Sequence, residues 1–228
     1  MRDKFEALAK KYNDNHYFEC DPVIFPKHFL QLYKEGQASL QDIEISALFA
    51  SHLAWGRRDM IVRDCKRLFE EMEWQPYNYV MRGEFRDDDS SLHRTIKWCE
   101  IAKICTGLKD FYSSNDTLET LSVDDIREKI FGRKRDLNAA NKKIHLFRRW
   151  MVRDDNIVDL GVWKRIKPSE LIIPLDVHVH RNALNCGITK RKSADFKAAK
   201  EITEYFAKIF PSDPCKGDFC LFGAGIDK

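Results

Sequence analysis

Apolar residues recur at helical spacing along most of this chain, and this pattern limits the possible folds more than any other feature. The segment from Glu44 to Trp55 is almost entirely apolar or small, which predicts a buried helix ended by Gly56. Apolar stripes, caps and stop signals predict further helices in the segments 58–73, 92–112, 122–131, 142–152, 176–186, 195–210 and 213–223. No segment shows a convincing β-hairpin signal. We therefore expect an all-α protein with about nine or ten helices.

The composition is that of an ordinary globular protein with a buried core: 228 residues, 43% of them hydrophobic and 33% charged. No stretch approaches the ~18 uninterrupted apolar residues that a membrane-spanning helix requires. The seven cysteines are odd in number, follow no secretory signal and include no Cys-x-x-Cys pair. This pattern predicts reduced thiols in the cytoplasm and gives little support to a zinc or iron–sulfur site.

Basic residues gather in two places, although the net charge is only +3. Eight of them lie between residues 133 and 153, against Asp136 alone: Arg133, Lys134, Arg135, Lys142, Lys143, Arg148, Arg149 and Arg153. The second cluster is Lys190-Arg191-Lys192. Such asymmetry fits a surface that faces a polyanion, although a solvated helix face is the alternative.

Lys142 and Lys143 begin the predicted basic helix, where the positive end of the helix dipole disfavours a cation. That field, with Arg148 and Arg149 nearby, favours a neutral amine, which can attack a sugar C1′ and form a Schiff base. The alternative is a plain phosphate-binding or solvated lysine pair.

Asp176 ends the apolar run Ile172-Ile173-Pro174-Leu175 and is a preferred residue type for the N-cap of the helix that follows. Its carboxylate could stabilise positive charge on a sugar ring as a base departs, and could shuttle protons. Simple helix capping is the alternative role.

Asp218 and Phe222 are four residues apart, so a helix places them on one side. A carboxylate beside an aromatic face could hold a flipped purine, with the ring stacked and the acid accepting an N–H. The alternative is that the phenylalanines of this segment belong to the core.

Asp176, His178 and His180 form a rival, metal-binding pattern. On a strand the three side chains would share one face, as a metal cluster requires. On a helix, residues two apart do not share a face.

Several motifs resemble the bacterial family DUF2400, and they extend over nearly the whole chain. The motifs are K-K-I-H-L-F-R-R-W-M-V-R from Lys142, D-L-G-V-W from Asp159, I-P-L-D-V-H-V-H-R from Ile173, D-P-V-I-F-P from Asp21 and L-A-W-G-R-R from Leu53. This family in turn resembles the helix-hairpin-helix (HhH-GPD) DNA glycosylases. Pro174 to His178 is similar to the V-D-T-H segment of endonuclease III-like enzymes, in which the Asp is catalytic.

The glycosylase resemblance implies a two-lobed helical bundle with Lys142 as the Schiff-base lysine. Asp218 and Phe222 resemble the acid and aromatic residue that grip the base in archaeal 8-oxoguanine glycosylases. The glycine hairpin that normally precedes the lysine is replaced by Arg133 to Ala140, so the hairpin motif is degenerate. We expect one domain over residues 1–228, with one lobe formed by about 1–125 and 195–228 and the other by about 126–194.

The expected function is a DNA glycosylase with AP lyase activity that excises an oxidised purine such as 8-oxoguanine. The catalytic residues would be Lys142, with Lys143 as the alternative nucleophile, and Asp176. The base-binding residues would be Asp218, Phe222, Phe147 and Trp55. The phosphate-binding residues would be Arg133, Lys134, Arg135, Arg148, Arg181 and Lys190.

No metal or cofactor is expected, and the expected partner is double-stranded DNA carrying a damaged base. The protein is expected to be a monomer associated with the cytoplasmic nucleoid and not with a membrane. Two alternatives remain. The missing hairpin favours a non-catalytic DNA-binding protein on a glycosylase scaffold, and the Asp176/His178/His180 pattern favours a metal-dependent hydrolase.

Overall fold

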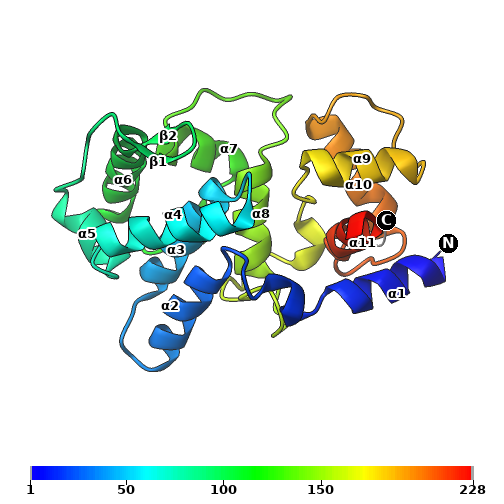
Figure 1. Cartoon of the computed structure of the whole chain (residues 1–228), viewed down its shortest axis with the longest axis horizontal. Helices are drawn as coiled ribbons and strands as arrows, with labels where there is room; N and C mark the ends of the chain where they lie inside the picture. The colour runs from blue at the N-terminus through cyan, green and yellow to red at the C-terminus, as the bar shows by residue number, and fades with distance from the viewer. Residues whose placement is uncertain (1, 227–228) are drawn as a thin grey trace. The chain divides into compact units, whose positions relative to one another are not determined.

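A computed structural model describes residues 2–226 of the chain, and side chains as far as Gly223 (Figure 1). The described residues are mostly helical, which confirms the all-α class. The chain forms two compact units: residues 1–19 with 136–228, here called the terminal unit, and residues 20–135, called the central unit. These units divide the chain differently from the two lobes expected from the sequence, which were 1–125 with 195–228 and 126–194.

The central unit is built around α3 (Leu40–Leu53), which is buried along most of its length, as its apolar sequence predicts. A capping box between Ser39 and Asp42 begins this helix. Three helices pack against or beside it: α2 (Ile24–Lys34), α4 (Arg58–Glu71) and α5 (Pro76–Arg82). The rest of the unit consists of α6 (Trp98–Tyr112), η2 (Leu118–Thr120), α7 (Val123–Asp125) and the π-helical turn η3 (Ile126–Ile130).

A short antiparallel hairpin precedes α6, although the sequence predicted a helix from Leu92 and no hairpin. It is formed by β1 (Ser91–His93) and β2 (Ile96–Lys97). The helix begins only at Trp98 because the chain reverses at Arg94, whose φ of 55° is left-handed. His93 anchors the hairpin: it is fully buried, with Nδ1 2.8 Å from Asp64 Oδ2.

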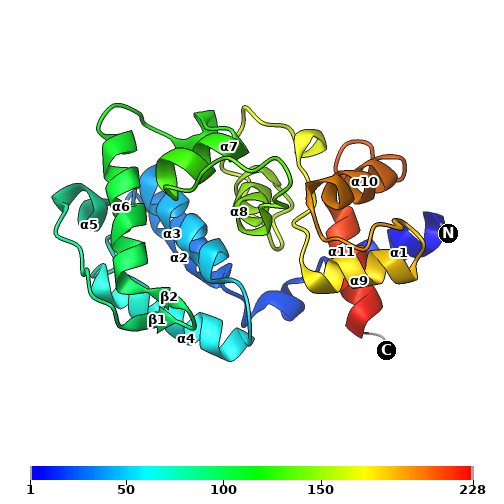
Figure 2. The same ribbon diagram turned by 90° about the horizontal axis from the view of Figure 1, so that it is seen from above.

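The terminal unit contains the two ends of the chain. Its elements are α1 (Arg2–Tyr12), η1 (Asn15–Phe18), α8 (Lys142–Val152), η4 (Pro168–Glu170), α9 (Val177–Asn185), α10 (Phe196–Ala207) and α11 (Lys216–Ile226). Helix α11 packs against α1 and α9, as Figure 2 shows. Gly223 permits the close approach to α1, because a Cβ at this position would collide with the ring of Tyr12.

Two helices of the terminal unit form where the sequence predicted them. Helix α8 has the predicted bounds, and α9 begins after its N-cap Asp176 and ends before Gly187, which has a φ of 67°. The side-chain amide of Asn182 on α9 donates a buried hydrogen bond of 2.8 Å to the carbonyl oxygen of Leu221 on α11. The position of Asp176 relative to α11 is therefore set by a specific polar contact as well as by packing.

Within residues 2–226, no helix has both the length and the apolar character needed to cross a membrane.

Candidate active site

Asp176 is the N-cap of α9, as predicted. Its Oδ1 accepts hydrogen bonds from the backbone N–H groups of His178, at 2.9 Å, and Val179, at 2.8 Å. The preceding residues Pro174 and Leu175 are buried and anchor the loop, whereas Asp176 itself is half-buried. Capping occupies only Oδ1, and Oδ2 accepts no hydrogen bond from the described residues. The carboxylate therefore has one oxygen left for other chemistry.

Lys142 and Lys143 occupy the first turn of α8, also as predicted. Both side chains are half-buried, and this first turn carries no acidic residue. Asn141, which precedes them, has a left-handed φ of 45° and makes no side-chain cap. The first turn of α8 thus carries two cations at the positive end of the helix dipole.

The charges of Lys142 and Asp176 both act on the carboxyl of Asp218. Burial raises its pKa to about 6, Arg149 opposes the rise, the Asp176 charge adds to it, and the Lys142 charge opposes it. The charges of Lys142 and Asp176 therefore both lie within electrostatic reach of the Asp218 carboxyl in the terminal unit. A joint site of these three residues stays a prediction.

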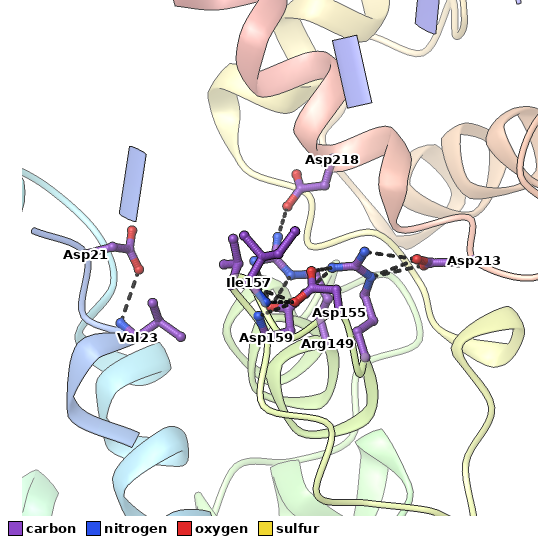
Figure 3. A network of polar contacts seen from close by, with 10 residues as sticks. Asp21, Val23, Arg149, Asp155, Ile157, Asp159, Asp213 and Asp218 are labelled. Carbon is purple, nitrogen blue, oxygen red and sulfur yellow. Dashed lines mark hydrogen bonds and ion pairs between the residues drawn. The ribbon is translucent and has the colours of Figure 1, made fainter. Parts of the chain in front are cut away.

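Asp218 also contacts Arg149. From the sequence, Arg149 was expected among the basic residues of a polyanion-facing surface. The guanidinium of Arg149 is only 5% exposed; it makes an ion pair with Asp218 and another of 3.2 Å with Asp159 (Figure 3). Burial alone would lower the pKa of Arg149, but Asp159 and Asp218 outweigh it and raise the pKa. Arg149 is therefore a buried cation that two carboxyl groups hold in place.

Arg153, one turn further along, is buried in the same way and also belongs to no exposed basic face. It makes ion pairs with Asp155 at 3.0 Å, with Asp213 at 2.9 Å and with Asp159. The guanidinium carbons of Arg149 and Arg153 lie 4.8 and 5.0 Å from the centre of the Phe219 ring. We call Arg149, Arg153, Asp155, Asp159, Asp213 and Asp218 the buried ion network.

The D-L-G-V-W motif builds one side of the buried ion network. The backbone N–H groups of Leu160 and Trp163 bond to carbonyl oxygens at the end of α8, those of Trp150 at 2.8 Å and Met151 at 2.9 Å. Gly161 is required at the turn, since its φ is 62° and a Cβ there would collide with Asp154. This return of the chain places Asp159 against both arginines. The motif was noticed in the sequence, but its role was not.

The predicted base-binding aromatic residues lie in three different surroundings. Phe147 is fully buried and packs edge-on against Trp163, with ring centres 5.1 Å apart, so it lies in the core, and its contact with a base stays a prediction. Phe222 is half-buried and makes edge contacts with Tyr12 and Tyr17. Trp55 belongs to the central unit, where its ring lies under the guanidinium of Arg94 at 4.4 Å.

The predicted phosphate-binding residues are distributed over both units. Arg133, Lys134 and Arg135 are exposed in the central unit, and Arg135 makes a 2.7 Å ion pair with Asp124. Arg148 is half-buried in the terminal unit, where Arg181 and Lys190 are exposed. The contact of these residues with phosphate remains a prediction.

The rival metal site does not form, because Asp176, His178 and His180 point to different partners. His178 is exposed and its Nδ1 lies 3.0 Å from the guanidinium of Arg181, whereas His180 is buried and its Nε2 lies 2.8 Å from the carbonyl oxygen of Arg191. Among the described residues, no group of three His, Cys, Asp or Glu side chains is placed to hold a metal ion.

Replacing Asp218 by asparagine is expected to change how stability depends on pH. Folding raises the pKa of this carboxyl from about 3.9 in an unfolded chain to about 6. The folded state therefore binds the proton more tightly, and the resulting stability is complete below about pH 4 and lost as the pH rises through about 6. The difference in unfolding free energy, wild type minus variant, should fall by about 2 kcal/mol between about pH 4 and pH 7.5.

Urea unfolding at the two pH values measures this difference. Asp154→Asn is the control, because the Asp154 side chain is 52% exposed and pairs only with Lys164 among the described residues. A wild-type-minus-variant difference for Asp218 that stays constant or increases with pH would contradict the expectation.

The fold and the site define a class of protein: it is all-helical, and one of its units contains a buried network of two arginines and four aspartates. The chain belongs to the DUF2400 family, described as a protein of unknown function, whose model matches residues 21–136 and 126–227. The comparisons with curated proteins and with solved structures found no match.

Proposed function

We propose that this protein is a DNA glycosylase with associated AP lyase activity, in which Lys142 is the nucleophile. One observation carries the proposal: the charges of Lys142 and Asp176 both act on the buried carboxyl of Asp218 within a single unit, although the three residues lie far apart in the sequence. An amine at the positive end of a helix, together with a carboxylate that has one oxygen available, suits nucleophilic substitution at a sugar carbon.

The steps follow from these groups. The neutral Lys142 amine attacks C1′ as the C1′–N bond of the damaged nucleotide breaks, and the departing base takes up a proton. Asp176 stabilises the positive charge that develops on the sugar and accepts a proton from the attacking amine. Opening of the sugar ring gives a Schiff base between Nζ and C1′, and loss of a C2′ proton then breaks the C3′–O bond and nicks the strand.

Asp218 fits the role of the base-recognising acid. With a pKa of about 6 it is mostly ionised at pH 7, so it acts as a hydrogen-bond acceptor for a base N–H. An oxidised purine such as 8-oxoguanine has such a donor at N7, where guanine has an acceptor. We therefore propose an oxidised purine in double-stranded DNA as the substrate, which agrees with the resemblance of the Pro174–His178 segment to helix-hairpin-helix glycosylases.

Borohydride trapping tests the proposal. The protein is incubated at neutral pH with duplexes that carry 8-oxoguanine, an abasic site or no lesion, with sodium borohydride or sodium chloride at equal ionic strength. We expect a covalent protein–DNA adduct with both lesions, only with borohydride, and a nicked strand in its absence. The absence of any adduct, where a known Schiff-base glycosylase is trapped, would contradict the proposal. DNA binding without cleavage would favour a non-catalytic binding protein.

A further inference from the structure

Arg149 lies on the same face of α8 as Lys142. The two residues are seven apart, which is close to two full helical turns. Helix α8 therefore presents the proposed nucleophile at its first turn and a guanidinium two turns later along one stripe. This arrangement raises the question of what Arg149 does for the proposed site.

The contacts of Arg149 all lead to residues around that site. Its Nη1 pairs with Oδ2 of Asp218, while its Nε and Nη2 lie 3.3 and 3.2 Å from Oδ1 of Asp159. The Asp159 side chain is fully buried, and the Asp218 side chain is 14% exposed. The guanidinium plane also rests on the Phe219 ring. Arg149 is thus fixed on three sides.

Charged groups from three neighbouring segments act on Asp218: Arg149 and Lys142 from α8, Asp159 from the loop after α8, and Asp176 at the start of α9. The Asp218 charge in turn raises the pKa of the buried thiols of Cys215 and Cys220. Among these, Arg149 is the cation in direct contact. Without it, Asp218 would be a buried carboxyl next to Asp176 and Asp159, which favours the protonated form.

We propose that Arg149 is the positioning residue of the site: it fixes Oδ2 of Asp218 and leaves Oδ1 as the acceptor for the substrate, while Asp159 fixes Arg149 from the other side. This inference rests on the proposed function, because it assigns Asp218 a substrate-facing role. A hydrogen-bond donor on the base would then meet an anionic oxygen held in one orientation. Loss of Arg149 would leave Asp218 mobile and largely protonated at neutral pH.

The direct test is a titration of the Asp218 carboxyl by ¹³C NMR of aspartate-labelled protein, with the signal assigned from Asp218→Asn. In Arg149→Met the midpoint should rise by about one to three pH units, because a contacting cation is lost. In Arg149→Lys the midpoint should lie between those of wild type and Arg149→Met, since lysine keeps the positive charge but lacks the planar guanidinium with its several N–H donors. If the methionine variant does not fold, the midpoint in the lysine variant alone should still exceed that of the wild type.

Arg153→Met is the matched control. Arg153 is equally buried, contacts Asp159 and lies on the same Phe219 ring, but has no contact with Asp218. In Arg153→Met the titration midpoint of Asp218 should stay within about half a pH unit of the wild-type value, because Arg153 does not contact that carboxyl. Equal shifts in both variants, or none in either, would overturn the proposal, since they would indicate a purely structural role.

The pH profile of borohydride trapping separates this inference from the proposed function. If wild type forms an adduct, the acid limb of the profile should move to higher pH in Arg149→Met and not in Arg153→Met. An unchanged profile in Arg149→Met would overturn the inference while the glycosylase proposal stands. If wild type forms no adduct, the glycosylase proposal fails and the substrate-facing role of Asp218 fails with it; the NMR titration then still decides whether Arg149 sets the ionisation of Asp218.

Discussion

Replacing Lys142 by glutamine is expected to abolish trapping of the protein on lesion-containing DNA. The substitution removes the amine that forms the Schiff base but keeps a polar side chain of similar length. Loss of a covalent nucleophile typically lowers the rate by a factor of about 1,000 or more. The measurement is the initial rate of adduct formation under borohydride, with the strand-nicking rate determined in parallel.

Lys143→Gln is the matched control for Lys142→Gln. Lys143 is the next residue of the same helix turn and is also half-buried, so the two variants remove equal charge from nearly the same place. We expect Lys143→Gln to keep trapping and to change mainly DNA affinity. The reverse pattern would assign the nucleophile to Lys143, and equal trapping by both variants would remove the amine role from this helix turn.

Replacing Asp159 by asparagine is expected to destabilise the protein by about 3–5 kcal/mol, the usual cost of breaking a buried ion pair from one side. Asp159 pairs with both Arg149 and Arg153, and its side chain is fully buried. Asparagine has nearly the same shape as aspartate but no charge, so the buried guanidinium groups of Arg149 and Arg153 lose an anion that they share. Equilibrium unfolding in urea at pH 7 measures the change in free energy.

The control for Asp159→Asn is Asp154→Asn, which removes a carboxylate five residues earlier in the chain. Its partner Lys164 is 69% exposed, so this surface pair should contribute less than about 1 kcal/mol. If the two variants lost similar stability, the buried ion network would not be the element that fixes the terminal unit, and the account of Arg149 would lose its structural basis.

Local patterns in the sequence were sufficient to predict the helices that carry the site. Helix α8 has the predicted bounds because its apolar stripe marks it, although cations in its first turn are disfavoured by the helix dipole. Asp176 caps α9 as expected, since a cap depends only on the following two or three backbone N–H groups. The site of Lys142, Asp176 and Asp218 expected from the resemblance stays a prediction, and the observation that supports it is that both other charges act on Asp218.

Long-range pairing could not be predicted in the same way. Arg149 and Asp218 are 69 residues apart, and Arg153 and Asp213 are 60 apart, so nothing local distinguishes these arginines from solvated ones. The sequence predicted both arginines to be part of a basic surface, whereas the structure buries both. The D-L-G-V-W motif was the available hint, because an aspartate and a glycine close behind a basic helix fit a loop that returns to it.

Core packing and a short hairpin explain the remaining differences. Phe147 was expected at the base, but it is buried in the core, where its ring packs edge-on against that of Trp163. The β1–β2 hairpin was missed because its strands are only three and two residues long and its turn lacks glycine. A left-handed Arg94 at a turn is uncommon and gives no sequence signal.

The most direct test of the central claim is the location of the trapped DNA on the protein. After borohydride reduction and nuclease digestion, peptide mass spectrometry identifies the lysine that carries the sugar remnant. We predict that the remnant is on Lys142, in the peptide that begins α8. A remnant on a lysine of the central unit, or on exposed lysines without preference, would contradict the assignment of a nucleophile beside Asp176 and Asp218.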